Sequence, residues 1–251
     1  MSHPPLPDPL CPIYRNSLIE NPKRQADLDN HDTALLCIDM QYLDAAEGHG
    51  LFRDYATSPI SLEEMAYYFN RLRETVVPNV HNLQNCFRAH RLEVIHVRIQ
   101  SLTRDGRDRS KGHKRLELHA APGSAEACFL EEVAPVGDEI VINKTASGVF
   151  SSTNLHYVLT NLGVSSLYVV GVYTNECVET TVRDACDLGY LVTMVDDCCA
   201  TVTPELHEAT VKNLRNRYAR VVDADAAMTE IEMRLPVAPE MEHVFSHPEG
   251  V

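Results

Sequence analysis

The chain has 251 residues, 44% of them hydrophobic, which is enough to bury a sizeable core in one α/β domain. Its formal net charge of −14 argues against a nucleic acid or an anionic membrane surface as a partner, since either requires a basic footprint. No apolar run approaches the roughly 18 residues of a membrane span, and the start of the chain lacks the order of a signal peptide. We therefore expect a cytoplasmic protein with reduced cysteines.

The predicted organisation has three parts. Residues 1–31 are rich in proline and polar residues, and they predict an irregular N-terminal arm that wraps the body or a neighbouring subunit. The body is predicted to span residues 32–225. Residues 226–251 are predicted to form a C-terminal tail.

Strand and helix patterns alternate along the body. Short, continuous apolar runs predict buried strands at 33–39, 92–99, 139–143, 166–172, 191–195 and 219–222. Amphipathic patterns predict helices at 63–89, interrupted at Pro78, and at 154–162, 177–188 and 205–218. This alternation predicts a three-layer, Rossmann-like α/β fold with a mainly parallel sheet of about six strands. Ligands of such sheets bind at the carboxyl ends of the strands.

Cys177 stands where the apolar run 166–172 gives way to a helical pattern. Free N–H groups and the dipole of a helix start favour an anion, so the pKa of this thiol is expected to fall. The alternative is that Cys177 is a small buried hydrophobe, as free cysteines usually are. Other cysteines lack this context. Cys37, Cys86, Cys128 and Cys186 are interpreted as packing residues, and the adjacent Cys198 and Cys199 are predicted to close a strand.

Two more reactive side chains end predicted strands. Asp39 closes the run at 33–39, and Lys144 follows the run at 139–143. Taken singly, each is better explained as a cap or a solvated strand end. Together with Cys177 they form a nucleophile with its base, in which Asp39 takes the thiol proton while Lys144 stabilises the thiolate and keeps Asp39 ionised.

Three segments resemble those of the isochorismatase-like cysteine hydrolases: Cys-Ile-Asp-Met-Gln at 37–41, Lys-Thr-Ala-Ser-Gly-Val-Phe at 144–150 and Gly-Val-Tyr-Thr-Asn-Glu-Cys at 171–177. The resemblance covers roughly residues 32–225. That superfamily includes nicotinamidases, N-carbamoylsarcosine amidohydrolase, biuret hydrolase and ureidoacrylate amidohydrolase.

The resemblance implies a catalytic triad of Asp39, Lys144 and Cys177. It also implies a cis peptide bond between Val172 and Tyr173, and an oxyanion hole formed by the N–H groups of Tyr173 and Cys177. The resemblance and the arm together predict a homo-oligomer, either a dimer or a tetramer.

The substrate pocket is expected to depart from the family pattern. After Gln41 the chain has Tyr-Leu-Asp, where many members have Asn-Asp-Phe, so the pocket aromatic is expected from Tyr42, Phe52 or Phe150. Gln41 and Thr174 lie within the motifs and complete this part of the predicted substrate-binding set.

The basic segment 104–114 has two interpretations. It is either a solvated loop or a lid whose Arg104, Arg107 or Arg109 binds a substrate carboxylate. Arg217, in the last predicted helix, is a second candidate for that contact.

The expected reaction needs no metal and no cofactor. Residues 95–109 lack the Asp-x-His element of the nicotinamidase metal site, and His49, His96 and His113 are interpreted as surface or structural residues. The leading hypothesis is a cysteine-dependent amidohydrolase that cleaves a C–N bond of a small amide or of a biuret-, ureidoacrylate- or N-carbamoyl-type compound. A thioester forms, and ammonia or an amine leaves. The alternatives are an isochorismatase-type vinyl-ether hydrolase, which needs the aspartate but no cysteine, and a catalytically silent scaffold.

Overall fold

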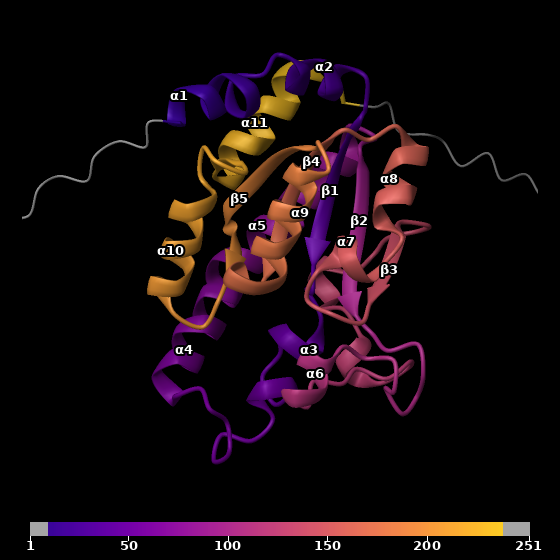
Figure 1. Ribbon diagram of the computed structural model, residues 1–251, viewed down its shortest axis with the longest axis vertical. Coiled ribbons are helices and arrows are strands. Elements are labelled where there is room, and N and C mark those ends of the chain that lie inside the picture. Colours follow the sequence, from indigo (N-terminus) through magenta and orange to yellow (C-terminus); the bar gives the residue numbers. More distant parts are fainter. Residues whose placement is uncertain (1–9, 238–251) are drawn as a thin grey trace, which may run out of the picture.

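The computed structural model describes residues 10–237 and shows one six-stranded sheet with the order β3-β2-β1-β4-β5-β6 (Figure 1). All neighbouring strands are parallel. The strands are β1 (Thr33–Ile38), β2 (Glu93–Ile99), β3 (Ile140–Lys144), β4 (Ser166–Val172), β5 (Leu191–Ala200) and β6 (Arg220–Val222). The predicted fold class is confirmed. β5 continues to Ala200 rather than ending at residue 195, so Cys198 and Cys199 lie within it.

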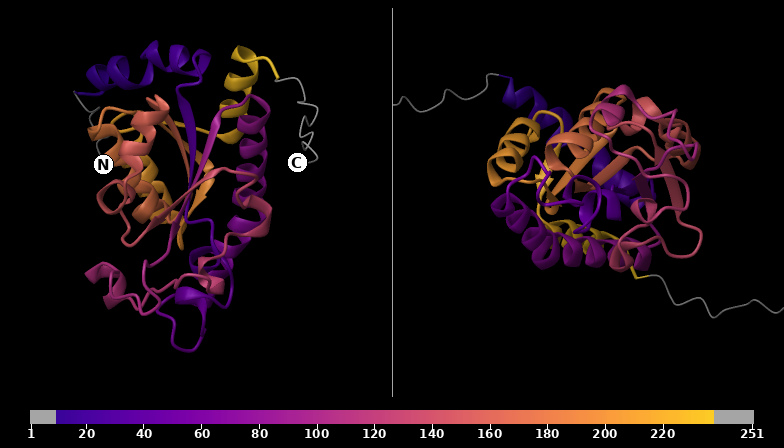
Figure 2. Two further views of the ribbon diagram at one scale, coloured as in Figure 1. Left: turned by 90° about the vertical axis from the view of Figure 1, so that its right-hand side faces the viewer. Right: turned by 90° about the horizontal axis from the view of Figure 1, so that it is seen from below.

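Helices cover both faces of the sheet (Figure 2). One layer contains α4 (Leu62–Arg71), the π-helical turn η3 (Leu72–Val76), α5 (Val77–Ala89) and α11 (Ala224–Arg234). The other contains α7 (Val149–Ser152), α8 (Leu155–Leu162), α9 (Glu179–Asp187) and α10 (Pro204–Leu214). Every residue of β1 and β4 is buried, which explains why their sequences are apolar without alternation. Within residues 10–237, none of the helices is long and apolar enough to cross a membrane.

The predicted long helix is continuous from α4 to α5. The expected interruption at Pro78 is the π-helical turn η3, which ends just before α5 begins. Proline lacks a donor N–H and crowds the preceding turn, so a wider turn at this point lets the helix continue.

The irregular conformation predicted for the N-terminal arm is wrong for residues 11–19 and 23–29. α1 (Cys11–Tyr14), η1 (Arg15–Ile19) and α2 (Lys23–Asp29) are helical and lie across the end of the sheet opposite α3 (Tyr42–Ala45) and α6 (Lys111–Arg115) (Figures 1 and 2). The buried Arg24 donates hydrogen bonds to Leu191 O and Thr193 Oγ1 of β5, which docks α2 on this sheet. Residues 1–9 lie outside the described part of the chain.

Helix α11 crosses the border predicted at residue 225. Its Ala227 and Ile231 are fully buried in the same hydrophobic cluster as α5. Residues 226–234 therefore pack with the body, whereas residues 238–251 lie outside the described residues.

β1 and β4 are neighbours at the point where the strand order reverses, where open parallel sheets leave a crevice beyond their carboxyl ends. Gly171 of β4 allows the two strands to approach closely. Its φ is +118°, and a Cβ at this position would lie 2.0 Å from Ile38 O of β1. Only glycine fits, so this residue brings the ends of β1 and β4 together.

Candidate active site

Asp39, Lys144 and Cys177 meet at the carboxyl edge of the sheet. Lys144 Nζ lies 2.9 Å from Asp39 Oδ2 and 3.2 Å from Cys177 Sγ. The three residues are 1%, 0% and 3% exposed, respectively. They form a buried group of a carboxylate, an ammonium and a thiol, which we call the reactive cluster.

The backbone at each strand end positions these side chains. Asp39 directly follows β1 with a φ of +53°, a left-handed conformation that is uncommon outside glycine, and its N–H donates to Val97 O of β2. Such conformations persist where the surrounding structure imposes them, often at functional sites. Lys144 is the last residue of β3, and its ammonium also donates to Ala146 O. Its side chain reaches past β2 to Asp39.

Cys177 lies in the π-helical turn η6 (Thr174–Val178), which leads directly into α9. The predicted cis peptide bond between Val172 and Tyr173 is present where β4 ends. On the other side of the cysteine, Thr181 Oγ1 donates to Cys177 O at 2.6 Å. The predicted strand-to-helix junction is therefore confirmed as the position of the thiol.

The expected fall in the thiol pKa is wrong. Burial raises the pKa of Cys177 well above its ordinary value, with Lys144 opposing this rise and the charges of Asp39 and Asp44 adding to it. Desolvation outweighs the favourable helix start, because a thiolate loses more solvation than the nearby positive groups restore. Burial therefore favours the protonated form of the thiol.

Asp39 and Lys144 lie beside this thiol as a buried ion pair. Burial raises the pKa of Asp39, although the adjacent Lys144 ammonium opposes the rise. For Lys144, burial acts to lower the pKa, but the charges of Asp39 and Cys177 outweigh it and keep the pKa above its ordinary value. Burial thus favours the neutral form of both the thiol and the Asp39 carboxyl, and the Lys144 ammonium opposes this effect at both groups.

Asp44 of α3 is a further buried acid that the sequence analysis did not assign. It is 3% exposed, and its Oδ2 has no hydrogen-bond partner within the described part of the chain. Burial raises its pKa well above the ordinary value, and the charge of Asp39 adds to that effect. The available signal was a carboxylate shortly after Gln41, in the segment that departs from the family pattern.

His113 of α6, expected to be a surface or structural residue, is buried. It is 3% exposed rather than a surface residue, and burial together with the Lys144 charge lowers its pKa to about 4. His96 is a structural residue, as predicted, with Nε2 2.9 Å from Glu139 Oε2. His49 lies near the surface, 3.7 Å from Glu126 Oε1.

Gln41 does not offer its amide to a substrate. Its Oε1 accepts a hydrogen bond from Ile99 N at 2.6 Å, and its Nε2 donates to Ile99 O and to Glu126 O at 3.0 and 2.7 Å. The side chain thus joins the segment after β1 to the end of β2 and to the turn η4 (Ala125–Ala127). Its position is structural, which corrects the expectation of substrate binding.

The aromatic candidates of the first motif differ in exposure. Phe52, in η2 (Gly50–Phe52), is fully buried, and its ring packs on those of Tyr68 and Tyr173. Tyr42 is half-buried, and its ring centroid lies 5.2 Å from that of His49. Phe52 therefore packs behind Tyr173 in the core, whereas Tyr42 is the more exposed of the two.

The arginines of segment 104–114 are engaged with their own loop or with solvent. Arg107 pairs with Asp105 in an exposed position, and Arg109 Nη1 donates to Leu118 O at 2.6 Å. Arg104 is exposed. The loop lies at the same end of the molecule as α3 and α6, but none of these contacts reaches the reactive cluster.

The structure does not bring Arg217 or Phe150 to the cluster. The Arg217 guanidinium lies over the Tyr14 ring of α1, 4.0 Å from its centroid, at the end of the molecule where α1 and α2 pack. Phe150 stacks on Tyr190, which directly precedes the start of β5. Both predictions fail because packing inside the protein commits these side chains elsewhere.

Thr174 is fully buried at the start of η6, and its hydroxyl is already paired. Its Oγ1 lies 2.9 Å from His207 Nδ1, and His207 Nε2 lies 2.6 Å from Asp196 Oδ1. This chain of contacts joins the turn that carries Cys177 to α10 and β5. Thr174 therefore anchors the turn rather than offering a free hydroxyl to a substrate.

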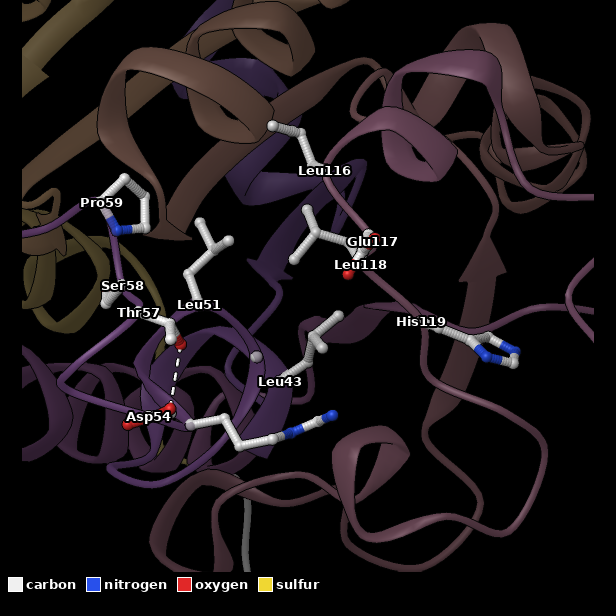
Figure 3. Close-up of a pocket in the computed structure, with 12 residues that line it drawn as sticks. Leu43, Leu51, Asp54, Thr57, Ser58, Pro59, Leu116, Glu117, Leu118 and His119 are labelled. Atoms are coloured by element: carbon white, nitrogen blue, oxygen red, sulfur yellow. Dashed lines mark hydrogen bonds between the residues drawn. The ribbon is translucent and has the colours of Figure 1, made fainter.

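A cavity of about 250 Å³ opens beside α3 (Figure 3). Leucine side chains from three segments gather around it: Leu43, Leu51, Leu116 and Leu118. Asp39, Lys144 and Cys177 are not among the residues that line it. Within residues 10–237, no group of three or more His, Cys, Asp or Glu side chains is arranged to hold a metal ion.

The parallel sheet, with its reactive groups at the carboxyl edge beside the switch point, defines the class of the protein as an open, Rossmann-like α/β fold. The family model described as Isochorismatase domain matches residues 33–226. The chain therefore belongs to the isochorismatase family of hydrolases.

Individual proteins of known sequence or structure are also similar to this chain. The chain is 32% identical over 192 residues to a probable inactive nicotinamidase of Arabidopsis thaliana, covering 74% of this chain and 89% of that protein. It is 32% identical over 128 residues to a ureidoacrylate amidohydrolase of Agrobacterium fabrum, covering 49% of this chain and 56% of that enzyme. The chain thus spans about half the length of this second relative. A crystal structure of an isochorismatase family protein from Desulfovibrio vulgaris matches with a TM-score of 0.63 and 26% identity, covering 78% of this chain and 96% of that one.

Proposed function

We propose that the protein is a cysteine-dependent amidohydrolase that cleaves a C–N bond of a small amide or ureido compound through a thioester. The observation that carries this proposal is the position of the Lys144 ammonium, in contact with both Cys177 Sγ and Asp39 Oδ2. Relatives named ureidoacrylate amidohydrolase and maleamate amidohydrolase support chemistry at a C–N bond.

The reaction begins when Cys177 Sγ attacks the carbonyl carbon of the substrate and the thiol proton passes to Asp39. The carbonyl π electrons move to oxygen, and the C–N bond then breaks as Asp39 returns the proton to the leaving nitrogen. Ammonia or an amine departs and leaves a thioester on Cys177. Water attacks the thioester, gives one proton to Asp39, and the thiol is restored when that proton returns to sulfur.

Lys144 remains protonated throughout this cycle. Its charge stabilises Asp39 as a carboxylate before the attack and favours the developing thiolate during it. The N–H groups of Tyr173 and Cys177 are proposed as the oxyanion hole, a role worth about 3 kcal/mol for each donor in well-studied acyl-transfer sites.

Two other functions make different predictions. A vinyl-ether hydrolase would need Asp39 but not Cys177, whereas the close contact of Lys144 with the thiol favours a role for sulfur. A silent scaffold remains an alternative because one relative is named a probable inactive nicotinamidase.

The test is ammonia release by the purified protein over nicotinamide, biuret, ureidoacrylate and N-carbamoyl amino acids, with intact-mass analysis of the protein during turnover. We expect release of ammonia from at least one compound and an acyl adduct on Cys177. Cys177→Ser should abolish both, whereas Cys186→Ser, on the following helix, should retain both. Hydrolysis of isochorismate is measured beside the panel: its hydrolysis by both the wild type and Cys177→Ser, without ammonia release from the amides, would favour the vinyl-ether hydrolase class, and no turnover of either kind of compound would favour the scaffold.

Three further predictions accompany this proposal: the substrate is a small molecule, the protein is cytoplasmic, and it forms a homo-oligomer, either a dimer or a tetramer. Seven described cysteines are free, which supports a reducing compartment.

A further inference from the structure

Asp44 is a buried acid that the proposed reaction does not use. It lies on α3, beyond the carboxyl end of β1, and its Oδ2 has no hydrogen-bond partner within residues 10–237. Buried polar atoms in folded proteins are nearly always paired, so an unpaired carboxylate oxygen requires an explanation. A group that binds at this position would supply the missing donor.

Contacts of the backbone hold Asp44 against the segment that carries Cys177. Asp44 O accepts hydrogen bonds from Tyr68 Oη at 2.8 Å and from Tyr173 Oη at 3.2 Å. Tyr173 directly precedes η6, so α3 and the cysteine turn are tied together. The charge of Asp44 accordingly acts on both Cys177 and Lys144.

The surroundings of Asp44 are acidic. Asp39 and Glu176 bring two more carboxyl groups within range of its charge, and Lys144 is the ammonium that faces them. His113 adds no charge near neutral pH, because burial and Lys144 lower its pKa to about 4. Burial and the charge of Asp39 raise the pKa of Asp44, so these surroundings disfavour a further negative charge such as a substrate carboxylate, whereas a neutral N–H group would find an acceptor in the unpaired Oδ2.

We propose that Asp44 determines substrate specificity by accepting a hydrogen bond from an N–H group beside the scissile carbonyl, so that the site takes neutral ureides and dicarboxamides in preference to substrates with a carboxylate there. This inference rests on the proposed amidohydrolase function. If it is correct, the arginines of segment 104–114 do not contact the reacting end of the substrate.

The test compares biuret with malonamate, two molecules of similar size that both release ammonia from a terminal carboxamide. They differ on the other side of the scissile carbonyl, where biuret has an N–H group followed by a second carboxamide and malonamate has a CH₂ group followed by a carboxylate. The ratio of their kcat/KM values is measured for the wild type, for Asp44→Asn and for Glu47→Gln. Glu47 is exposed on the same segment, and its replacement removes one negative charge without reaching the site.

We expect the wild type and Glu47→Gln to prefer biuret. Asp44→Asn should shift the ratio toward malonamate by about tenfold or more, because an amide N–H₂ replaces the acceptor oxygen. Thermal unfolding and the alkylation rate of Cys177 establish that Asp44→Asn is folded with its thiol in place. A ratio that is equal in all three proteins to within about threefold would overturn the role of Asp44.

Measurements of binding affinity test the role of Asp44 independently of the proposed amidohydrolase reaction. Calorimetric titration of Cys177→Ser and of Cys177→Ser/Asp44→Asn with the same two compounds requires no turnover. A shift in relative affinity without any ammonia release by the wild type would support Asp44 and contradict the amidohydrolase. Ammonia release with an unchanged relative affinity and an unchanged kcat/KM ratio would support the amidohydrolase and contradict the role of Asp44. If the protein neither binds these compounds nor releases ammonia from them, both proposals are contradicted.

Discussion

Lys144 Nζ lies 2.9 Å from Asp39 Oδ2, although the two residues end strands that β2 separates in the sheet. Both side chains are almost completely buried. A buried ion pair contributes little net stability, but the loss of one partner leaves the other charge uncompensated. The pair therefore makes the ends of β1 and β3 depend on each other.

Replacement of Lys144 by methionine should destabilise the protein strongly. Asp39 would remain buried without its ammonium, and we expect the free energy of unfolding to fall by about 3 kcal/mol or more in urea denaturation. Lys111→Met, on the exposed start of α6, should change it by less than about 0.5 kcal/mol. The double variant Asp39→Asn/Lys144→Met should recover part of the loss. Equal stabilities of Lys144→Met and Lys111→Met would contradict this account of the pair.

Gly171→Ala should disrupt the contact between β1 and β4. The new Cβ would lie 2.0 Å from Ile38 O, a backbone atom inside the sheet, so we expect a loss of about 3 kcal/mol or more and a lower kcat. Gly189→Ala is the matched control, because Gly189 also has a positive φ but has no atom within 4 Å of the added Cβ. It should cost about 1 kcal/mol, from backbone strain alone. Similar losses for the two variants would show that the close approach is unimportant.

Gln41→Leu should reduce stability rather than substrate affinity. The change removes three hydrogen bonds and leaves buried groups of Ile99 and Glu126 without partners, which we expect to cost about 2 kcal/mol. Chemical denaturation measures the cost, with Gln25→Leu on the exposed side of α2 as control. A raised KM together with unchanged stability would restore Gln41 as a substrate-binding residue.

The stability of the protein should depend on pH through His113. Its pKa is about 4 in the folded protein, against an ordinary value of 6.5, because burial and Lys144 disfavour the charged ring. Between these two values the unfolded chain binds the proton more readily, so stability falls as the pH falls from 6.5 to 4. Urea denaturation at several pH values should show a smaller fall in His113→Gln than in the wild type. Parallel pH profiles for the two proteins would contradict the assignment.

Much of the fold and of the reactive cluster could be predicted from local patterns. The run at 166–172 is apolar at every position because β4 is buried on both faces, and Cys177 follows it in the helical turn that the change of period indicated. Asp39 and Lys144 were found by the rule that parallel strands bring their carboxyl ends to one edge.

The predictions that failed concern contacts between distant segments. The Arg217 guanidinium could bind a carboxylate, but it lies over the ring of Tyr14 instead. Tyr14 belongs to a part of the chain that was predicted to be irregular. Gln41 lies within the right motif, yet its amide is taken up by Ile99 and Glu126. Neither partner could be inferred from the residues adjacent in the sequence.

The sequence by itself determined the order of strands and helices and which reactive residues end the strands, because apolar periodicity is a local property. Only the tertiary structure decided that Lys144 touches both Asp39 and Cys177, and that Asp44 joins their surroundings. It also reversed the expected pKa of Cys177. A helix start is visible in the sequence, but the desolvation that keeps the proton on sulfur comes from every segment packed around it.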